Sequence, residues 1–185
     1  MKTFLKTLII FLLIGIPFSS CDDVESLADI DFNSSMSTDL NVVVPATTVS
    51  YKSAVKLGVS FSNQNTIDPK SDPTFKKYAD KIKSIKVQEV TATVTKISKP
   101  VKIESGTLSI FQGSKKASWS ISNFDVAIGK KISLDSAEGQ FATINSILNS
   151  KNVFTAKIEG TVDDDDVAFT VAILIKADIV ANPLK

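Results

Sequence analysis

Apolar residues at every second position constrain the fold of this chain more than any other feature. Successive side chains of a strand point to opposite faces, so this period places one apolar face against a core. The alternation is clearest where Val55, Leu57, Val59 and Phe61 share a face with polar residues between them. Similar patterns predict further strands at 40–44, 85–94, 108–110, 119–121, 153–162 and 167–180.

Two of these stretches carry extra information. In 85–94 the alternation slips by one residue between Val87 and Val90, which predicts a β-bulge near Gln88–Glu89. The stretch 167–180 is apolar on both faces, which is typical of a central strand covered on both sides. The predicted fold class is therefore mainly β. It is a two-sheet antiparallel sandwich, immunoglobulin-like or similar, of about seven to nine strands with two short helices.

Both short helices are predicted from a change to helical spacing. The first has Phe75, Tyr78, Ala79 and Ile82 on one stripe, with Ser71 or Asp72 as its cap and Pro73 in its first turn. In the second, Asp135 and Glu138 form a variant of the capping box, and an apolar stripe follows. That stripe consists of Phe141, Ile144, Ile147 and Leu148. We expect both helices to plug the ends of the sandwich or to cross between its sheets.

The residue types that are missing restrict the chemistry of the protein. The chain has no histidine, every one of its 21 basic residues is lysine, and Cys21 is its single cysteine. Histidine is the usual general base and metal ligand, and arginine is the usual bidentate clamp for phosphate and carboxylate. Histidine-based triads and His/Cys zinc sites are excluded on this ground. We predict no catalytic residues, no metal site and no cofactor.

Cys21 follows a segment with the layout of a secretion signal. Lys2 and Lys6 form the basic start, the stretch 7–16 is a short apolar core, and Pro17 ends it before Ser19 and Ser20. The apolar core is shorter than the roughly 20 residues that a transmembrane helix needs. An unpaired cysteine would leave a secreted protein with an oxidisable thiol, and acylation of Cys21 removes that thiol. Attached acyl chains also anchor the protein, at about 0.8 kcal/mol per buried methylene.

The residues around Cys21 resemble a known motif. Phe18-Ser19-Ser20-Cys21, followed by Asp22 and Asp23, resembles the lipobox of lipoproteins from Bacteroidota-type bacteria, with Phe18 where leucine is common. The rest of the chain resembles uncharacterised outer-membrane or cell-surface lipoproteins of these bacteria, with an acidic leader, alternating strands and a Lys-rich helix running into a strand. The resemblance implies lipidation at Cys21 and export to the outer membrane, on its periplasmic face or at the cell surface. It implies no known activity.

These patterns divide the chain into three parts. Residues 1–20 are predicted to be a lipoprotein signal peptide, 21–31 an acidic tether, and 32–185 a single β-sandwich domain. Removal of 1–20 from the 185-residue chain leaves 165 residues, which is enough for one core. The remaining 19 basic and 20 acidic residues nearly balance, so we expect no nucleic-acid partner.

Several candidate sites have two interpretations. The run Asp163–Asp166 could gather calcium, but a solvated hairpin tip is favoured because the run joins two strong strands. Trp119 is expected in the core beside Ile121, and a sugar-stacking position is the alternative. Asp135-Ser136-Ala137 resembles O-glycosylation sites of the same bacteria, which makes Ser136 a candidate for a glycan. The lysine pairs at 76–77, 115–116 and 130–131 are interpreted as solvated surface rather than a basic rim for acidic glycans or lipid headgroups.

Three functions remain open at this point. The first is a lipid-anchored envelope protein, held to the membrane through Cys21, that has a non-enzymatic binding, adhesion or accessory role with an envelope protein or glycan as partner. The second is a carrier of an apolar ligand, which predicts a cavity of at least about 300 Å³ between the sheets. The third is a glycoside hydrolase with carboxylates about 5–9.5 Å apart. It ranks last because Glu89 and Glu104, the two free candidates among five glutamates, belong to no motif.

Overall fold

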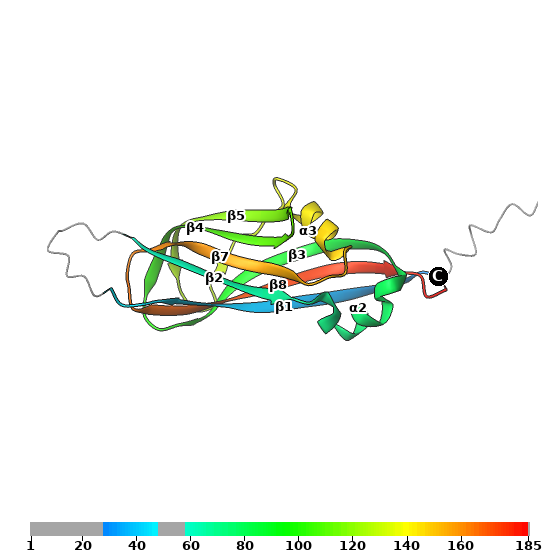
Figure 1. The fold of residues 1–185 in the computed structure, drawn as a ribbon, viewed down its shortest axis with the longest axis horizontal. Coiled ribbons are helices and arrows are strands. Elements are labelled where there is room, and N and C mark those ends of the chain that lie inside the picture. The colour runs from blue at the N-terminus through cyan, green and yellow to red at the C-terminus, as the bar shows by residue number, and fades with distance from the viewer. Residues whose placement is uncertain (1–27, 48–57, 185) are drawn as a thin grey trace, which may run out of the picture.

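The computed structural model describes residues 28–47 and 58–184, and these residues form two antiparallel four-stranded sheets. The first sheet has the order β1-β8-β3-β6, and the second has the order β2-β7-β4-β5 (Figure 1). The strands are β1 (Ile30–Val44), β2 (Val59–Ile67), β3 (Ile82–Ile97), β4 (Val101–Gln112), β5 (Lys115–Val126), β6 (Lys131–Ile132), β7 (Phe154–Val162) and β8 (Val167–Ala181). The predicted mainly-β sandwich with two short helices is confirmed.

The apolar alternation forms the core, as predicted. In β8 the side chains of Val171, Ile173, Ile175 and Ile179 are fully buried between the sheets. This strand lies between β1 and β3, so its predicted central position is confirmed. Its outer face is only half-covered around Ala172 and Leu174, so the expectation of cover on both sides is wrong for that face. The predicted bulge is present as a register shift between Val87 and Glu89.

Two glycines allow close approach of neighbouring strands in the second sheet. Gly106 of β4 and Gly160 of β7 are register partners. A Cβ on Gly160 would lie 2.6 Å from the Cα of Gly106, and a Cβ on Gly106 would lie 2.8 Å from the backbone oxygen of Glu159. Both distances are shorter than real Cβ contacts. The backbones therefore need glycine at these two positions.

The helix α2 (Pro73–Tyr78) follows β2 after a 3-10 turn, η2 (Pro69–Ser71), and a second turn, η3 (Ala79–Lys81), leads into β3. Asp72 is its N-cap, because its Oδ1 accepts hydrogen bonds from the backbone N–H of Thr74 and Phe75. The other oxygen, Oδ2, accepts from the Ser34 hydroxyl at 3.0 Å and from the Ser35 N–H at 3.3 Å. One carboxylate thus starts the helix and fastens it to β1.

The helix α3 (Gln140–Leu148) packs against β3, β4 and β5, so it crosses between the two sheets as expected. Ile144, Ile147 and Leu148 of its predicted stripe are fully buried, and Phe141 is half-buried. The predicted capping box is wrong. The N-cap is Gly139 in a left-handed conformation (φ 79°), and this residue makes no side-chain cap. A turn that ends in positive φ replaces the carboxylate cap, and glycine adopts that conformation without strain.

The two ends of the sandwich differ. Ile30 of β1 is the register partner of Ala181 of β8, so the described chain begins and ends at the same end of the molecule (Figure 1, right). Val44 and Val167 lie at the opposite end, where β3 also finishes at Ile97. Strand β1 begins at Ile30, so it includes the last two residues of the predicted tether 21–31. The signal peptide and most of that tether lie outside the described residues.

Candidate functional site: an apolar cleft at one end of the sandwich

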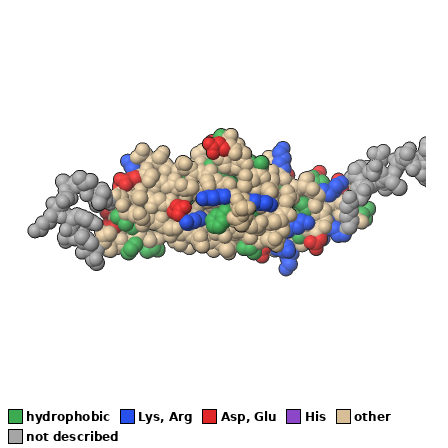
Figure 2. Space-filling model, turned by 45° about the horizontal axis from the view of Figure 1, so that its top comes forward, with side chains coloured by type: hydrophobic (Ala, Val, Ile, Leu, Met, Phe, Trp, Pro, Cys, Tyr) green, Lys and Arg blue, Asp and Glu red, His purple; other side chains and the backbone are tan. Residues whose placement is uncertain are grey.

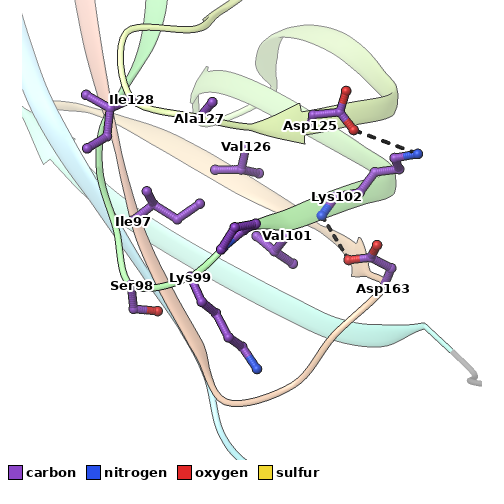
Figure 3. Close-up of a pocket in the computed structure, with 11 residues that line it drawn as sticks. Ile97, Ser98, Lys99, Val101, Lys102, Asp125, Val126, Ala127, Ile128 and Asp163 are labelled. Carbon is purple, nitrogen blue, oxygen red and sulfur yellow. Dashed lines mark hydrogen bonds and ion pairs between the residues drawn. The ribbon is translucent and has the colours of Figure 1, made fainter.

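An apolar cleft of about 670 Å³ lies at the end of the sandwich opposite Ile30 (Figure 3). Three described connections cross from one sheet to the other at this end, and the last of them along the chain is the run Asp163–Asp166 between β7 and β8. The first crossing runs from Ile97 of β3 to Val101 of β4, and the second leaves β5 after Val126 on its way to β6. The cleft lies between these two crossings, and Asp163 of the third crossing also lines it.

Apolar side chains form most of the cleft wall. Ile97, Val101, Val126, Ala127 and Ile128 surround the space in Figure 3. Val101 and Val126 are buried parts of the core, whereas the Ile128 side chain is 69% exposed. The floor of the cleft is therefore continuous with the core, and its outer lip carries one of the most exposed large apolar side chains of the described residues. Exposed apolar surface of this kind is unfavourable in water unless something covers it.

Paired charges hold the rim of the cleft. Asp163 Oδ1 accepts a hydrogen bond of 2.8 Å from the Lys102 N–H, and the Asp163 N–H donates to the Lys102 carbonyl at 3.1 Å. The Lys102 side chain lies 3.7 Å from Asp125, which also pairs with Lys130 at 3.4 Å. Lys99 pairs with Asp164 at 3.1 Å. These contacts fix the backbone around the cleft, and the groups at its mouth present both signs of charge.

The run Asp163–Asp166 is a corner between the sheets and not a hairpin tip. It joins β7 of one sheet to β8 of the other, so the hairpin interpretation is wrong in its topology. Its carboxylates turn to separate partners, and Asp165 accepts bonds from both the N–H and the hydroxyl of Thr47. The hydroxyl bond is the main cause that holds the pKa of Asp165 below its ordinary value. The described residues contain no group of three or more metal-ligating side chains.

A second, polar groove of about 380 Å³ follows the outer side of β5. One wall is β5 itself and the other is the segment before α3. Trp119 lies at its base with its ring buried in the core beside Ile121, so the predicted core position is confirmed. The indole N–H of Trp119 donates a 2.7 Å hydrogen bond to the carbonyl of Asp135, which ties the far wall to the strand. The lining residues are Ser118, Trp119, Ser120, Ser133, Asp135, Ala137, Glu138 and Gln140.

Ser136, the candidate glycosylation residue, lies in this far wall. Its side chain is exposed, and its hydroxyl oxygen accepts a 3.0 Å hydrogen bond from the Phe141 N–H in the first turn of α3. The hydroxyl thus helps to hold the start of the helix in place of the predicted Asp135 cap. Glycosylation at Ser136 stays a prediction, as does lipidation at Cys21, which lies outside the described residues.

The other predicted residues are dispersed. Lys77 lies over the Tyr78 ring at 4.7 Å, Lys115 donates to the Ser146 carbonyl at 2.9 Å, and Lys130 belongs to the cleft rim. Glu89 is in β3 of one sheet, where it pairs with Lys176 at 2.8 Å, and Glu104 is in β4 of the other sheet. Neither glutamate lines the cleft or the polar groove.

Sequence patterns did not identify the cleft. Its residues come from the ends of strands and from the two crossings, where the apolar period is interrupted. The one usable signal was the apolar Ile128 beside Gly129, in a segment otherwise expected to be a polar turn.

Comparisons with known proteins add no assignment. No protein-family model matches the chain, and no curated protein and no solved structure shows significant similarity to it. No helix in the part of the chain that the structure describes combines the length and the apolar character needed to span a membrane.

Proposed function

We propose that this chain is a lipid-anchored protein of the bacterial envelope with a non-enzymatic binding role, and that the apolar cleft is its binding site. The observation that carries the proposal is the position of the cleft at the end opposite Ile30. A chain held through Cys21 approaches the sandwich at the Ile30 end. The cleft then faces away from the membrane and is open to a partner.

The anchor rests on the signal layout and the lipobox-like residues before Cys21. Its test is metabolic labelling of growing cells with an alkyne-tagged palmitate, followed by membrane fractionation. We expect label on the protein and its recovery with the outer membrane. A Cys21→Ser variant is expected to lose both. Label retained by Cys21→Ser would contradict the anchor.

The binding role is tested by photo-crosslinking in living cells. A photoreactive amino acid at position 128 lies at the cleft lip, and the same amino acid at position 153 is an exposed control outside it. We expect a discrete adduct from position 128 that Ala127→Trp removes, because indole fills the cleft. Equal adducts from both positions, or an adduct that Ala127→Trp leaves unchanged, would argue against the cleft as the site.

The cleft volume also favours the second function, a carrier of an apolar ligand. Its roughly 670 Å³ is within the range of small-molecule sites, about 300–1,000 Å³. It differs from the expected cavity because it opens to solvent at the end of the sandwich. A carrier binds a fluorescent fatty acid saturably and loses this binding in Ala127→Trp. Absence of saturable binding leaves the partner-binding role as the function of the cleft.

A further inference from the structure

The outer side of β5 is an open strand edge. β5 is the last strand of its sheet, and β4 pairs with it on one side only. A two-residue turn, Gly113–Ser114, joins the two strands, and Gly113 has φ +56° as the first position of a type II′ turn requires. Such a turn is closed by a hydrogen-bonded pair, here Gln112 and Lys115.

The register then decides which backbone groups of β5 point outward. Hydrogen-bonded and non-hydrogen-bonded pairs alternate along an antiparallel ladder. Counting from Lys115, the N–H and C=O groups of Ser118, Ser120 and Ser122 point away from β4. An independent contact agrees with this count, because Gln140 Nε2 approaches the Ser118 carbonyl at 3.5 Å from outside the sheet. Within the described ranges, no backbone hydrogen bond from another segment reaches the outward groups of these three serines.

On the edges of the other sheet, side chains bind single backbone groups. On β3, Asn145 of α3 accepts from the Val87 N–H at 2.7 Å, and β6 pairs farther along. On β1, Asp72 accepts from the Ser35 N–H, and Asn65 Nδ2 donates to the Asp39 carbonyl at 3.3 Å. Uncovered edges favour pairing with other chains, so folded proteins usually block them. On β5, the small side chains of Ser118, Ser120 and Ser122 alternate with the buried Trp119 and Ile121, and the groove lies beside Ser118 and Ser120.

The far wall of this groove carries two carboxylates, and Lys116 lies with Glu138 in the extension of the groove. Asp135 and Glu138 are exposed, and neither pairs with a lysine of the described residues. A narrower extension of about 230 Å³ continues the groove past Ser118 toward Lys116 and Thr143. In the other direction β5 runs on to Asp125 and Val126, which belong to the apolar cleft. On the face shown in Figure 2, lysine side chains gather around a small apolar patch near the middle, and acidic side chains lie in separate places.

We propose that the β5 edge binds an extended peptide segment of a partner protein as an added strand. The segment pairs with the outward groups of Ser120 and Ser122. It places a lysine or arginine side chain against Asp135 and Glu138, and an apolar side chain in the cleft beyond Val126. This recognition mode takes affinity from main-chain hydrogen bonds and specificity from pockets for alternate side chains. The inference deepens the proposed binding role and rests on it for the existence of a partner.

Hydrogen exchange of the purified full chain with synthetic peptides tests the proposal. The probe is a ten-residue peptide of alternating valine and threonine with lysine at two central positions, and the matched control carries glutamate at those positions. We expect the lysine peptide to slow exchange of the Ser120 and Ser122 amides by at least about tenfold, and the glutamate peptide to bind about tenfold more weakly. No protection by either peptide at about 1 mM overturns the site. Equal binding of both peptides overturns the proposed charge of the partner.

Two variants separate the edge from the charges. Ser120→Pro removes an outward N–H that β4 does not use, so the ladder inside the sheet is kept. This variant is expected to bind the lysine peptide at least about tenfold more weakly than the wild type does. Asp135→Asn with Glu138→Gln leaves the backbone untouched and tests the site even if the proline variant is unstable. This double variant is expected to make the two peptides bind equally. If the peptides fail to bind the β5 edge, the crosslink expected from position 128 is unaffected, because the crosslinking experiment does not depend on this edge.

Discussion

Asp72 joins two elements of the fold through the hydrogen bonds of its side chain. Its carboxylate caps α2 and binds both the hydroxyl of Ser34 and the N–H of Ser35 on β1. Partial burial raises the pKa of Asp72, but hydrogen bonds from Phe75, Ser34, Ser35 and Thr74 outweigh burial and hold it below the ordinary value of 3.8. The ionised form is therefore the one that stabilises the fold.

Asp72→Ala is expected to lower the free energy of unfolding by about 1–3 kcal/mol, from the lost cap and the unpaired groups on β1. Urea unfolding followed by circular dichroism measures this loss. Asp68→Ala is the matched control, because Asp68 caps only the 3-10 turn η2. A loss no larger than that of Asp68→Ala would show that the bonds to β1 contribute nothing.

The same residue gives a pH dependence with a defined sign. A depressed folded-state pKa means that the contribution of Asp72 is complete above about pH 4 and is lost as the pH falls through the folded pKa. Asp72→Asn keeps the shape of the side chain but cannot titrate. We expect its unfolding free energy to fall less steeply than that of the wild type below pH 4, as measured by urea unfolding at a series of pH values. Parallel pH profiles would contradict this assignment.

At the scale of elements, the glycine pair decides how closely β4 and β7 approach. Gly160→Ala places a methyl group against the backbone of Gly106, which cannot move without shifting the strand. We expect a loss of about 1–3 kcal/mol, measured by thermal or urea unfolding. Gly113→Ala is the control for a glycine in open space: it faces no atom within 4 Å but has positive φ. A Gly160→Ala variant as stable as the wild type would contradict the predicted clash.

The edge of β3 depends on one side chain of α3. Asn145→Ala leaves the Val87 N–H without its partner at the bulge, and a buried unpaired donor costs about 1–3 kcal/mol. Asn149→Ala, at the C-cap of the same helix, is the control because its cap contact is made by the backbone. We expect Asn145→Ala alone to speed exchange of the Val87 amide and to promote aggregation. Unchanged exchange at Val87 would show that another group protects this edge.

These elements show what sequence reasoning can and cannot recover. The alternation of apolar residues correctly predicted that Val171, Ile173 and Ile175 are in the core. The slip in this alternation after Val87 correctly predicted the bulge. Both predictions depend only on neighbours in sequence. The start of α3 was mispredicted, because Asp135 lies five residues before the helix and its carbonyl instead binds Trp119. Asn145 and the cleft were missed, since their roles come from contacts between segments distant in sequence.

At the scale of the whole molecule, the two ends of the sandwich differ: the described chain begins and ends at one of them, and the cleft lies at the other. Asp29 lies just before β1 and binds Lys83 at 2.8 Å and the buried Asn182 at 3.0 Å, so both ends of the described chain are fastened together. Eight chain steps separate Asp29 from Cys21, which is a reach of at most about 28 Å. Strand β1 has 15 residues and is roughly 50 Å long. A protein anchored through Cys21 would therefore hold its base near the membrane and its cleft far from it.

Energy transfer to a membrane dye measures this orientation. With Cys21 acylated, Leu184→Cys and Ile128→Cys each supply a single reactive thiol at an exposed position, 78% and 69% exposed respectively. Leu184 lies beside Asn182 at the base, and its N–H donates to the Asn182 side chain at 2.9 Å. Because the two sites are separated by most of the length of the sandwich, we expect several-fold stronger transfer from position 184 than from position 128. Removing the anchor by Cys21→Ser, with the same labels, should abolish transfer from both positions. Equal transfer from the two sites of the anchored protein would mean that the sandwich lies flat on the membrane, and the cleft would then not face away from it.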